Sequence, residues 1–183
     1  MKPGLLVASP ALDGSLFSRS VILLAQYSEE GAMGVVINRE LGVTMGELMQ
    51  QLEMGAPRQP EVNVMWGGPV EPGAGLVVLS GRSQLPEGRC VLAVEGTDLG
   101  VSASRIVLED VTRGQLPGDF MVCLGYAGWG PGQLDQEISE GSWLMTDLDL
   151  GILFGLSPEE RWQQCVASLG QALPLLWIPP LEE

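Results

Sequence analysis

Residues 119–138 read DFMVCLGYAGWGPGQLDQEI. The apolar run 120–124 predicts a strand that is buried on both faces. Glycines then interrupt the chain, with Tyr126 and Trp129 between them, and Gln133 and Glu137 follow at once. Glycine allows positive φ and close backbone approach, whereas tyrosine and tryptophan offer large faces with one polar group each. We therefore expect a binding site here, on a glycine-rich loop that runs from Tyr126 to Glu137.

Two other interpretations fit the same residues. The first is a tight turn with Trp129 packed in the core. The second is a phosphate-binding loop, because a strand, a glycine-rich turn and a helix start follow one another. The glycines do not follow the GxGxxG spacing, and no lysine or arginine lies nearby in the sequence. Nucleotide binding is therefore the weakest of the three interpretations.

Outward from this stretch, apolar runs and turn residues predict the remaining elements. Strands are expected over 5–8, 21–27, 33–39, 62–66, 75–80, 90–95 and 143–146. Helices are expected after Thr44, after Ser104, over 134–139 and after Ser157. The strands come in groups with helices between them, which favours an α+β fold over a regular βαβ alternation. A chain of 183 residues is expected to form one domain over 1–183, with a frayed proline-rich tail over 174–183.

Composition excludes several classes of function. The net charge is −14, with nine basic residues against 23 acidic ones, and such a surface repels nucleic acid and anionic lipid. The sequence has no histidine, which excludes histidine general bases, Ser-His-Asp triads and histidine-ligated metals. The only lysine is Lys2, which argues against P-loop and Schiff-base enzymes.

The cysteines indicate the compartment. Cys90, Cys123 and Cys165 are far apart, odd in number and outside any CxxC pair. We expect reduced thiols in the core of a cytoplasmic protein. The longest apolar runs are far too short to span a bilayer, and the first residues do not resemble a signal peptide, so we expect no membrane association. We also expect no cofactor and no metal.

Two polar pairs flank a predicted hairpin. Arg19-Ser20 precedes its first strand and Asn38-Arg39 ends its second. In an antiparallel hairpin the start of one strand lies beside the end of the next, so we expect these pairs to meet. Two guanidinium groups in an acidic protein would make a local anion site. The alternative is that both arginines pair with nearby carboxylates.

Two further groups complete the set of candidates. Gly67, Gly68 and Pro69 predict a sharp bend that curves the sheet, or else a wall of the same cleft. The acidic residues Asp135, Glu137, Asp147 and Asp149 have side chains that can bind Mg²⁺ or Ca²⁺. They lack EF-hand spacing, so we interpret them as solvated loop carboxylates.

Four stretches in register resemble one family. They are 19–21 (RSV), 30–39 (EGAMGVVINR), 67–70 (GGPV), and 125–129 (GYAGW) with Gly132, Gln133, Leu134 and Glu137. They are similar to the YqgE/AlgH family, also called UPF0301 or DUF179, from about Gly4 to Gly170. The resemblance implies a bacterial cytoplasmic protein with a bent, partly barrel-like mixed sheet flanked by a few helices. It implies no known activity, although one branch is linked to control of alginate synthesis and labelled a transcriptional regulator.

The chain departs from the family pattern in three places. Leu79 stands where the family commonly has a histidine, and Ser104-Arg105 stands where it commonly has Ser-Asp. The Gly-His-Ala common near the C-terminus is missing. Chemistry that needs those histidines is therefore not expected from this chain.

Together these observations predict a non-enzymatic binding or adaptor domain, possessing a cleft for a small anionic ligand or a peptide partner. The expected ligand-binding residues are Arg19, Ser20, Asn38, Arg39, Gly67, Gly68, Pro69, Tyr126, Gly128, Trp129, Gln133 and Glu137. The alternatives are a transcriptional regulator that contacts DNA, which the acidic charge disfavours, and a metal-assisted hydrolase.

Overall fold

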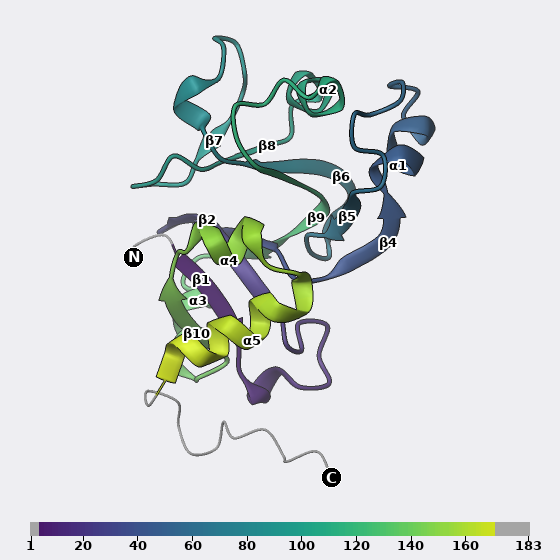
Figure 1. Ribbon diagram of the computed structural model, residues 1–183. Helices are drawn as coiled ribbons and strands as arrows, with labels where there is room; N and C mark the ends of the chain where they lie inside the picture. The colour runs from purple at the N-terminus through teal and green to yellow at the C-terminus, as the bar shows by residue number, and fades with distance from the viewer. Residues whose placement is uncertain (1–3, 171–183) are drawn as a thin grey trace.

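One bent β-sheet organises the molecule (Figure 1). The computed structural model describes residues 4–170, so the expected frayed tail over 174–183 lies outside the described residues. In that range the sheet has ten strands: β1 (Gly4–Ala8), β2 (Val21–Ser28), β3 (Gly31–Val36), β4 (Glu40–Thr44), β5 (Asn63–Trp66), β6 (Val70–Leu79), β7 (Leu92–Ala93), β8 (Gly100–Ser102), β9 (Phe120–Trp129) and β10 (Trp143–Asp147). Eight of them follow the order β10-β1-β2-β3-β9-β6-β8-β7, while β4 pairs with β5 and β5 with β9.

The sheet is mixed and open. Strands β5 and β9 run parallel, and the other pairs are antiparallel. Within residues 4–170 the end strands β7 and β10 do not pair with each other, so the sheet bends without closing into a barrel. The expected α+β fold with a bent mixed sheet is thereby confirmed.

Strand β9 is the centre of the sheet, and it differs from the sequence-based expectation. We expected the strand to end at Leu124, but it continues to Trp129. One edge of β9 pairs with β6, over Phe120–Leu124 and again at Tyr126, whereas the other edge pairs first with β5 and then with β3. The change of partner falls at Gly125, whose φ of 76° bends the backbone in a way that a larger residue resists. The glycines therefore let the strand pass through a bend, and the predicted loop over Tyr126–Glu137 is wrong.

The helices begin where their capping residues predict. Helix α1 (Met45–Gln51) starts with a complete capping box between Thr44 and Glu47, and α5 (Pro158–Leu169) with one between Ser157 and Glu160. Such caps stabilise a helix by about 1 kcal/mol each. The other α-helices are α2 (Arg105–Arg113), α3 (Gln133–Ser139) and α4 (Leu150–Gly155), and the short 3₁₀ helices are η1 (Pro10–Leu12) and η2 (Arg82–Gln84). Helix α4 was expected only as an apolar run.

Three predicted strands have other bounds. The strand expected over 33–39 ends at Val36: Ile37 still bonds to Val21 through its backbone, Asn38 bonds through its side chain, and β4 then begins at Glu40. The strand expected from residue 75 begins at Val70. The strand expected over 90–95 shrinks to Leu92–Ala93, which is an exposed pair at the end of the sheet.

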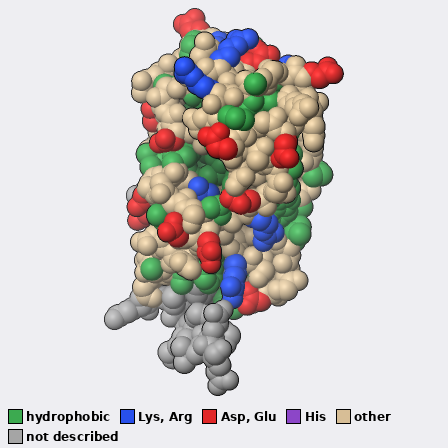
Figure 2. Space-filling model, turned by 45° about the vertical axis from the view of Figure 1, so that its right-hand side comes forward, with side chains coloured by type: hydrophobic (Ala, Val, Ile, Leu, Met, Phe, Trp, Pro, Cys, Tyr) green, Lys and Arg blue, Asp and Glu red, His purple; other side chains and the backbone are tan. Residues whose placement is uncertain are grey.

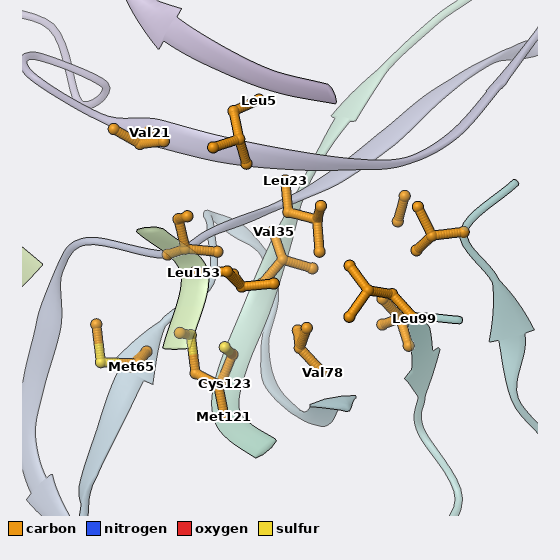
Figure 3. Packing of buried hydrophobic residues seen from close by; sticks show 14 of the residues in the cluster. Leu5, Val21, Leu23, Val35, Met65, Val78, Leu99, Met121, Cys123 and Leu153 are labelled. Carbon is orange, nitrogen blue, oxygen red and sulfur yellow. The ribbon is translucent and has the colours of Figure 1, made fainter. Parts of the chain in front are cut away.

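Both faces of β1, β2 and β3 are covered, as their continuous apolar sequences predict. One face carries a cluster that includes Leu5, Leu23, Val35 and Leu153 (Figure 3). Helices α4 and α5 lie side by side over these strands (Figure 1). The other face carries a second cluster with Trp129, Trp143 and Leu134 of α3. A third cluster packs α1 and α2 against β5, β6 and β9.

No helix between Gly4 and Gly170 combines the length and the apolar character that crossing a membrane requires.

Candidate functional site

Asn38 joins the two polar pairs that the sequence placed at the ends of the hairpin. Its Oδ1 accepts a hydrogen bond from the Val21 amide at 2.8 Å, and its Nδ2 donates to the Arg19 carbonyl at 2.8 Å. The side chain thus fixes the backbone ahead of β2. Arg19 has a φ of 53°, which is a left-handed conformation that costs a non-glycine residue about 1–2 kcal/mol.

Arg39 holds the segment that precedes β2. Its Nη1 donates to the Leu16 carbonyl at 2.7 Å, and its Nη2 donates to the Ser18 carbonyl at 3.2 Å and to Ser20 Oγ at 3.3 Å. The guanidinium carbon lies 4.7 Å from the centre of the Trp66 ring. Burial lowers the pKa of Arg39 from its ordinary value. These contacts give Arg39 a structural role in addition to any role in binding.

Asn38 links the Arg19 backbone to the residue before Arg39, but the guanidinium groups of Arg19 and Arg39 stack on different tryptophans. The Arg19 group lies 5.5 Å from the centre of the Trp162 ring, on the side of the sheet that α5 covers. Among residues 4–170 the ion pairs join Arg89 to Asp110 and two arginines of α2 to Glu109. No described carboxylate therefore pairs with Arg19 or Arg39.

Arg161 is a third arginine at this end of β3, and the sequence did not single it out. It is only 8% exposed, its Nη1 donates to the Ile37 carbonyl, and its Nε is buried without an acceptor in the described part of the chain. Burial lowers the pKa of Arg161, while the negative charge of Glu40 acts in the opposite direction. A solvated helix surface would also carry an arginine here, so no local pattern distinguishes it.

The two glycine motifs pack against each other through their backbones. The Gly67 amide donates to the Leu124 carbonyl at 2.8 Å, and the Val36 amide donates to the Gly67 carbonyl at 2.8 Å. A β-carbon on Gly68 would overlap the backbone of Tyr126, and one on Gly125 would overlap the Gly68 carbonyl. The two motifs therefore touch directly at Gly68 and Gly125. Pro69 and Gly128 are exposed at its rim, and Tyr126 is half-buried.

Glu137 ties α3 to the core. Its Oε2 accepts hydrogen bonds from the indole nitrogens of Trp129 and Trp143, both at 2.9 Å. Its Oε1 accepts from Gln133 Nε2 at 2.9 Å, and Gln133 Oε1 accepts from the Gly130 amide at 3.0 Å. Trp129 itself is 7% exposed. These three predicted residues come together as a packed network rather than as an open surface.

A chain of aromatic contacts connects this network to Arg39. Ring centres are 6.0 Å apart between Trp129 and Trp143, 5.7 Å between Trp143 and Phe17, and 6.2 Å between Phe17 and Trp66. Sequence reasoning missed Phe17, Trp66 and Trp143. Scattered single aromatics carry no spacing signal, and only the tertiary fold brings them together.

The titratable groups give no reactive centre in the described part. Residues 4–170 contain no group of three or more acidic or cysteine side chains placed to hold a metal ion. Burial raises the pKa of Cys123 to about 12 and that of Cys165 to about 11, so both thiols stay protonated near neutral pH. Cys90 is exposed, which corrects the expectation that all three thiols lie in the core.

Fold and site together define a class of protein. It is an α+β protein with an open mixed sheet, whose central strand changes partner where it packs on a Gly-Gly-Pro turn. The chain belongs to the AlgH-like family DUF179, whose model matches residues 5–174. This confirms the resemblance inferred from the four stretches of sequence.

Relatives match along most of their length. A UPF0301 protein of Thioalkalivibrio sulfidiphilus is 39% identical over 173 residues, which cover 93% of this chain and 90% of that protein. A UPF0301 protein of Paracoccus denitrificans is 42% identical over 170 residues, which cover 91% and 88%.

Two solved structures share the fold. The solution structure of the AlgH protein from Pseudomonas aeruginosa superposes with a TM-score of 0.78 at 36% identity, and the match covers 99% of this chain and 95% of that one. The crystal structure of a protein from Corynebacterium diphtheriae has a TM-score of 0.73 at 22% identity, covering 97% and 92%. The second similarity concerns the fold alone.

Proposed function

We propose that this protein is a non-enzymatic cytoplasmic binding or adaptor protein, which recognises an anionic group on a small ligand or on a peptide. The proposal rests on the surroundings of the Arg19 side chain. This residue is exposed, it stacks on Trp162, and it lacks an ion pair with any described carboxylate, although the chain has 23 acidic residues.

The backbone of Arg19 supports a role in binding. A left-handed arginine persists only where its surroundings enforce it, and such strain gathers at functional sites. Asn38 enforces the conformation through the hydrogen bond to the Arg19 carbonyl. A guanidinium that lies on an aromatic ring keeps its N–H edge open, and that edge matches the two oxygens of a carboxylate or phosphate.

Neighbouring arginines strengthen the local positive potential. Arg161 adds a largely buried charge without a carboxylate partner in the described residues, and Arg39 adds another close to Ser20. On the face shown in Figure 2, basic side chains lie among acidic ones without forming a continuous patch. A small anion or a short acidic segment suits such a site better than the phosphate backbone of DNA, which requires an extended basic surface.

The compartment and the regulatory role belong to the same proposal. Cys90, Cys123 and Cys165 are free thiols, as is usual for cytoplasmic proteins. The chain is 36% identical to the AlgH protein of Pseudomonas aeruginosa. A regulatory role like that linked to the AlgH branch would act here through the binding of an anionic partner.

The test is an NMR titration of the full-length ¹⁵N-labelled protein with sodium succinate and with inorganic phosphate. We expect saturable shifts of the amides of Arg19, Asn38 and Trp162. The variant Arg19→Ala should lose these shifts while the rest of its spectrum stays native. Arg105→Ala is the matched control, because it removes the same charge from an exposed arginine that pairs with Glu109.

The proposal fails if neither anion shifts these amides. It also fails if Arg19→Ala binds as tightly as the wild type. Unfolding of Arg19→Ala would make the residue structural, and Arg19→Lys then decides. Lysine keeps the charge without the planar fork, so weakened binding by a folded Arg19→Lys variant would still assign recognition to this side chain.

A further inference from the structure

A cavity of about 460 Å³ has a lining that includes none of Arg19, Arg39 and Arg161. One side of it comes from the corner after β6 and from the turn between β7 and β8, and includes Gln84, Asp98 and Leu99. The other side comes from Leu148 and Leu150 at the start of α4. The volume falls within the range of about 300–1,000 Å³ that is usual for small-molecule sites.

The inner wall of the cavity is apolar. Leu99 is 1% exposed and belongs to the main core, and Leu148 packs against the same core cluster. Leu150 is 51% exposed, which makes it one of the few large apolar side chains left open to solvent in the described part. A ligand with a hydrocarbon body would cover Leu150 and gain about 25 cal/mol for each Å² of apolar surface removed from water.

Most polar side chains of the cavity are already bonded within the protein. Ser80 Oγ accepts from the Asp119 amide at 2.8 Å. Thr97 Oγ1 donates to the Val94 carbonyl at 2.7 Å and accepts from the Leu99 amide at 3.1 Å. These hydroxyl groups have little capacity left for a ligand.

Two polar groups at the rim can still form hydrogen bonds with a ligand. The Gln84 side chain makes no hydrogen bond to any residue in the range 4–170. The Asp98 carboxylate accepts from the Ser83 amide at 2.7 Å and from Ser83 Oγ at 2.9 Å. These bonds fix its orientation, and a carboxylate has about four acceptor positions, so two remain open.

Most charges around the cavity are negative, although Arg82 follows Gly81 directly and its backbone amide donates to the Asp98 carbonyl at 3.1 Å. No lysine or arginine lines it. Asp98 stands at the rim, Asp149 lies between the two leucines of the opposite wall, and Asp119 follows Gly118. The Asp149 carboxylate caps α4 by accepting from the Gly151 amide at 2.7 Å. An anionic ligand would be repelled here, whereas a cation would be attracted.

We propose that this cavity binds a small organic cation, with an ammonium group on Asp98 and Gln84 and an apolar body against Leu99, Leu148 and Leu150. The site is separate from the anion site around Arg19, and it does not depend on that proposal. Its ligand would carry the opposite charge, so ligands that differ only in charge distinguish the two sites.

The test uses the full-length ¹⁵N-labelled protein with n-hexylammonium chloride, sodium hexanoate and hexan-1-ol. We expect hexylammonium to shift the amides of Thr97, Leu99 and Leu150 in a saturable way. Hexanol should bind more weakly, and hexanoate should leave these amides unchanged. If hexanoate shifts amides around Arg19, that result reports on the anion site and is not evidence about the cavity.

Variants test the polar rim and the apolar wall of the cavity separately. Asp98→Asn keeps the shape and should weaken hexylammonium binding by about tenfold, since a hydrogen bond to a charged group is lost. Leu150→Gln removes the apolar wall at an exposed position and should weaken it by about fivefold. The control Glu159→Gln removes one negative charge from an exposed position on α5 outside the cavity and should bind as the wild type.

Three results would overturn the proposal. The first is that hexylammonium shifts no amide of the cavity, the second is that hexanoate shifts the same amides as strongly, and the third is that Asp98→Asn and Leu150→Gln both bind like the wild type. If Asp98→Asn fails to fold, because Ser83 has lost its partner, Leu150→Gln alone decides the question.

Discussion

The carbonyl oxygen of Gly68 occupies the space that a β-carbon on Gly125 would need. Gly125 also has a φ of 76°, so two independent constraints require glycine at this bend of β9. We expect Gly125→Ala to destabilise the protein by about 3 kcal/mol or more, from left-handed strain together with steric overlap. Urea unfolding followed by circular dichroism measures this difference.

Gly132 provides the control for that substitution. Its φ is 71°, and nothing lies within 4 Å of a β-carbon placed on it. Gly132→Ala should therefore cost only the backbone strain, about 1 kcal/mol. Equal losses in the two variants would contradict the close packing of the two glycine motifs.

Local signals in the sequence predicted the helix starts, and nonlocal contacts explain the failures. Thr44 with Glu47 and Ser157 with Glu160 meet within one turn, so their spacing alone marks a helix start. The passage of β9 through Gly125 depends on Gly68, which lies far away in the sequence, and a glycine-rich run otherwise indicates a loop.

The same distinction applies to the candidate site. The meeting of Arg19 with Asn38 followed from hairpin geometry, which the sequence shows. The stacking of Arg19 on Trp162 and of Arg39 on Trp66 did not, because helix α5 and strand β5 reach the hairpin only in the folded chain.

Glu137 should contribute to stability through the hydrogen bonds that it accepts from two indole groups. Glu137→Gln can keep its one oxygen at the two indole N–H groups, but its amide then faces Gln133 Nε2, a donor against a donor, and the two indole bonds lose their charged acceptor, so we expect a loss of about 1–3 kcal/mol. Intrinsic tryptophan fluorescence should change in the folded state as well, because Trp129 and Trp143 lose the negative charge of their shared partner. Chemical denaturation followed by fluorescence reports both effects.

Glu140→Gln is the matched control on the same helix. Glu140 is exposed, and within the described part of the chain its carboxylate accepts one hydrogen bond, from Gln136 Nε2 at 2.8 Å. Its replacement should change stability by less than about 0.5 kcal/mol. A comparable loss in Glu140→Gln would mean that the effect arises from helix charge and not from the indole contacts.

Arg39 should hold the segment 16–20 in place. Arg39→Ala removes hydrogen bonds to Leu16, Ser18 and Ser20, and we expect a loss of about 2 kcal/mol. Amide hydrogen exchange should become faster over residues 16–20 in particular. Arg39→Lys should not restore protection, because an ammonium group cannot span these acceptors while stacking on Trp66.

Arg113→Ala serves as the comparison for Arg39→Ala. The Arg113 side chain is 63% exposed, and its ion pair among residues 4–170 is with Glu109, at 4.0 Å. Its loss should leave both stability and exchange over 16–20 unchanged. Normal protection of this segment in Arg39→Ala would show that other contacts hold it.

The two capping boxes should make stability depend on pH in the acid range. Hydrogen bonds from the Thr44 backbone and side chain lower the pKa of Glu47 below its ordinary 4.5, and those from Ser157 do the same for Glu160. A carboxyl group whose pKa is lowered by folding stabilises the fold above its unfolded pKa. That contribution is lost as the pH falls through and below 4.5.

Urea midpoints measured between pH 7 and pH 3 test this dependence. The double variant Glu47→Gln and Glu160→Gln should lose less stability over that interval than the wild type, because glutamine does not titrate. The double variant Glu53→Gln and Glu159→Gln replaces carboxylates that do not belong to a capping box. Its urea midpoints should change with pH as those of the wild type do. Identical slopes for both double variants would contradict the prediction.

The three thiols should differ sharply in reactivity towards a disulfide reagent at pH 8. Cys90 is exposed and should react within minutes. Cys123 and Cys165 are buried, and their pKa values of about 12 and about 11 leave almost no thiolate at that pH. One equivalent should therefore react in the native protein and three after unfolding. Cys90→Ser should abolish the fast phase, whereas fast reaction of a second thiol would show that the core around Cys123 and Cys165 opens readily.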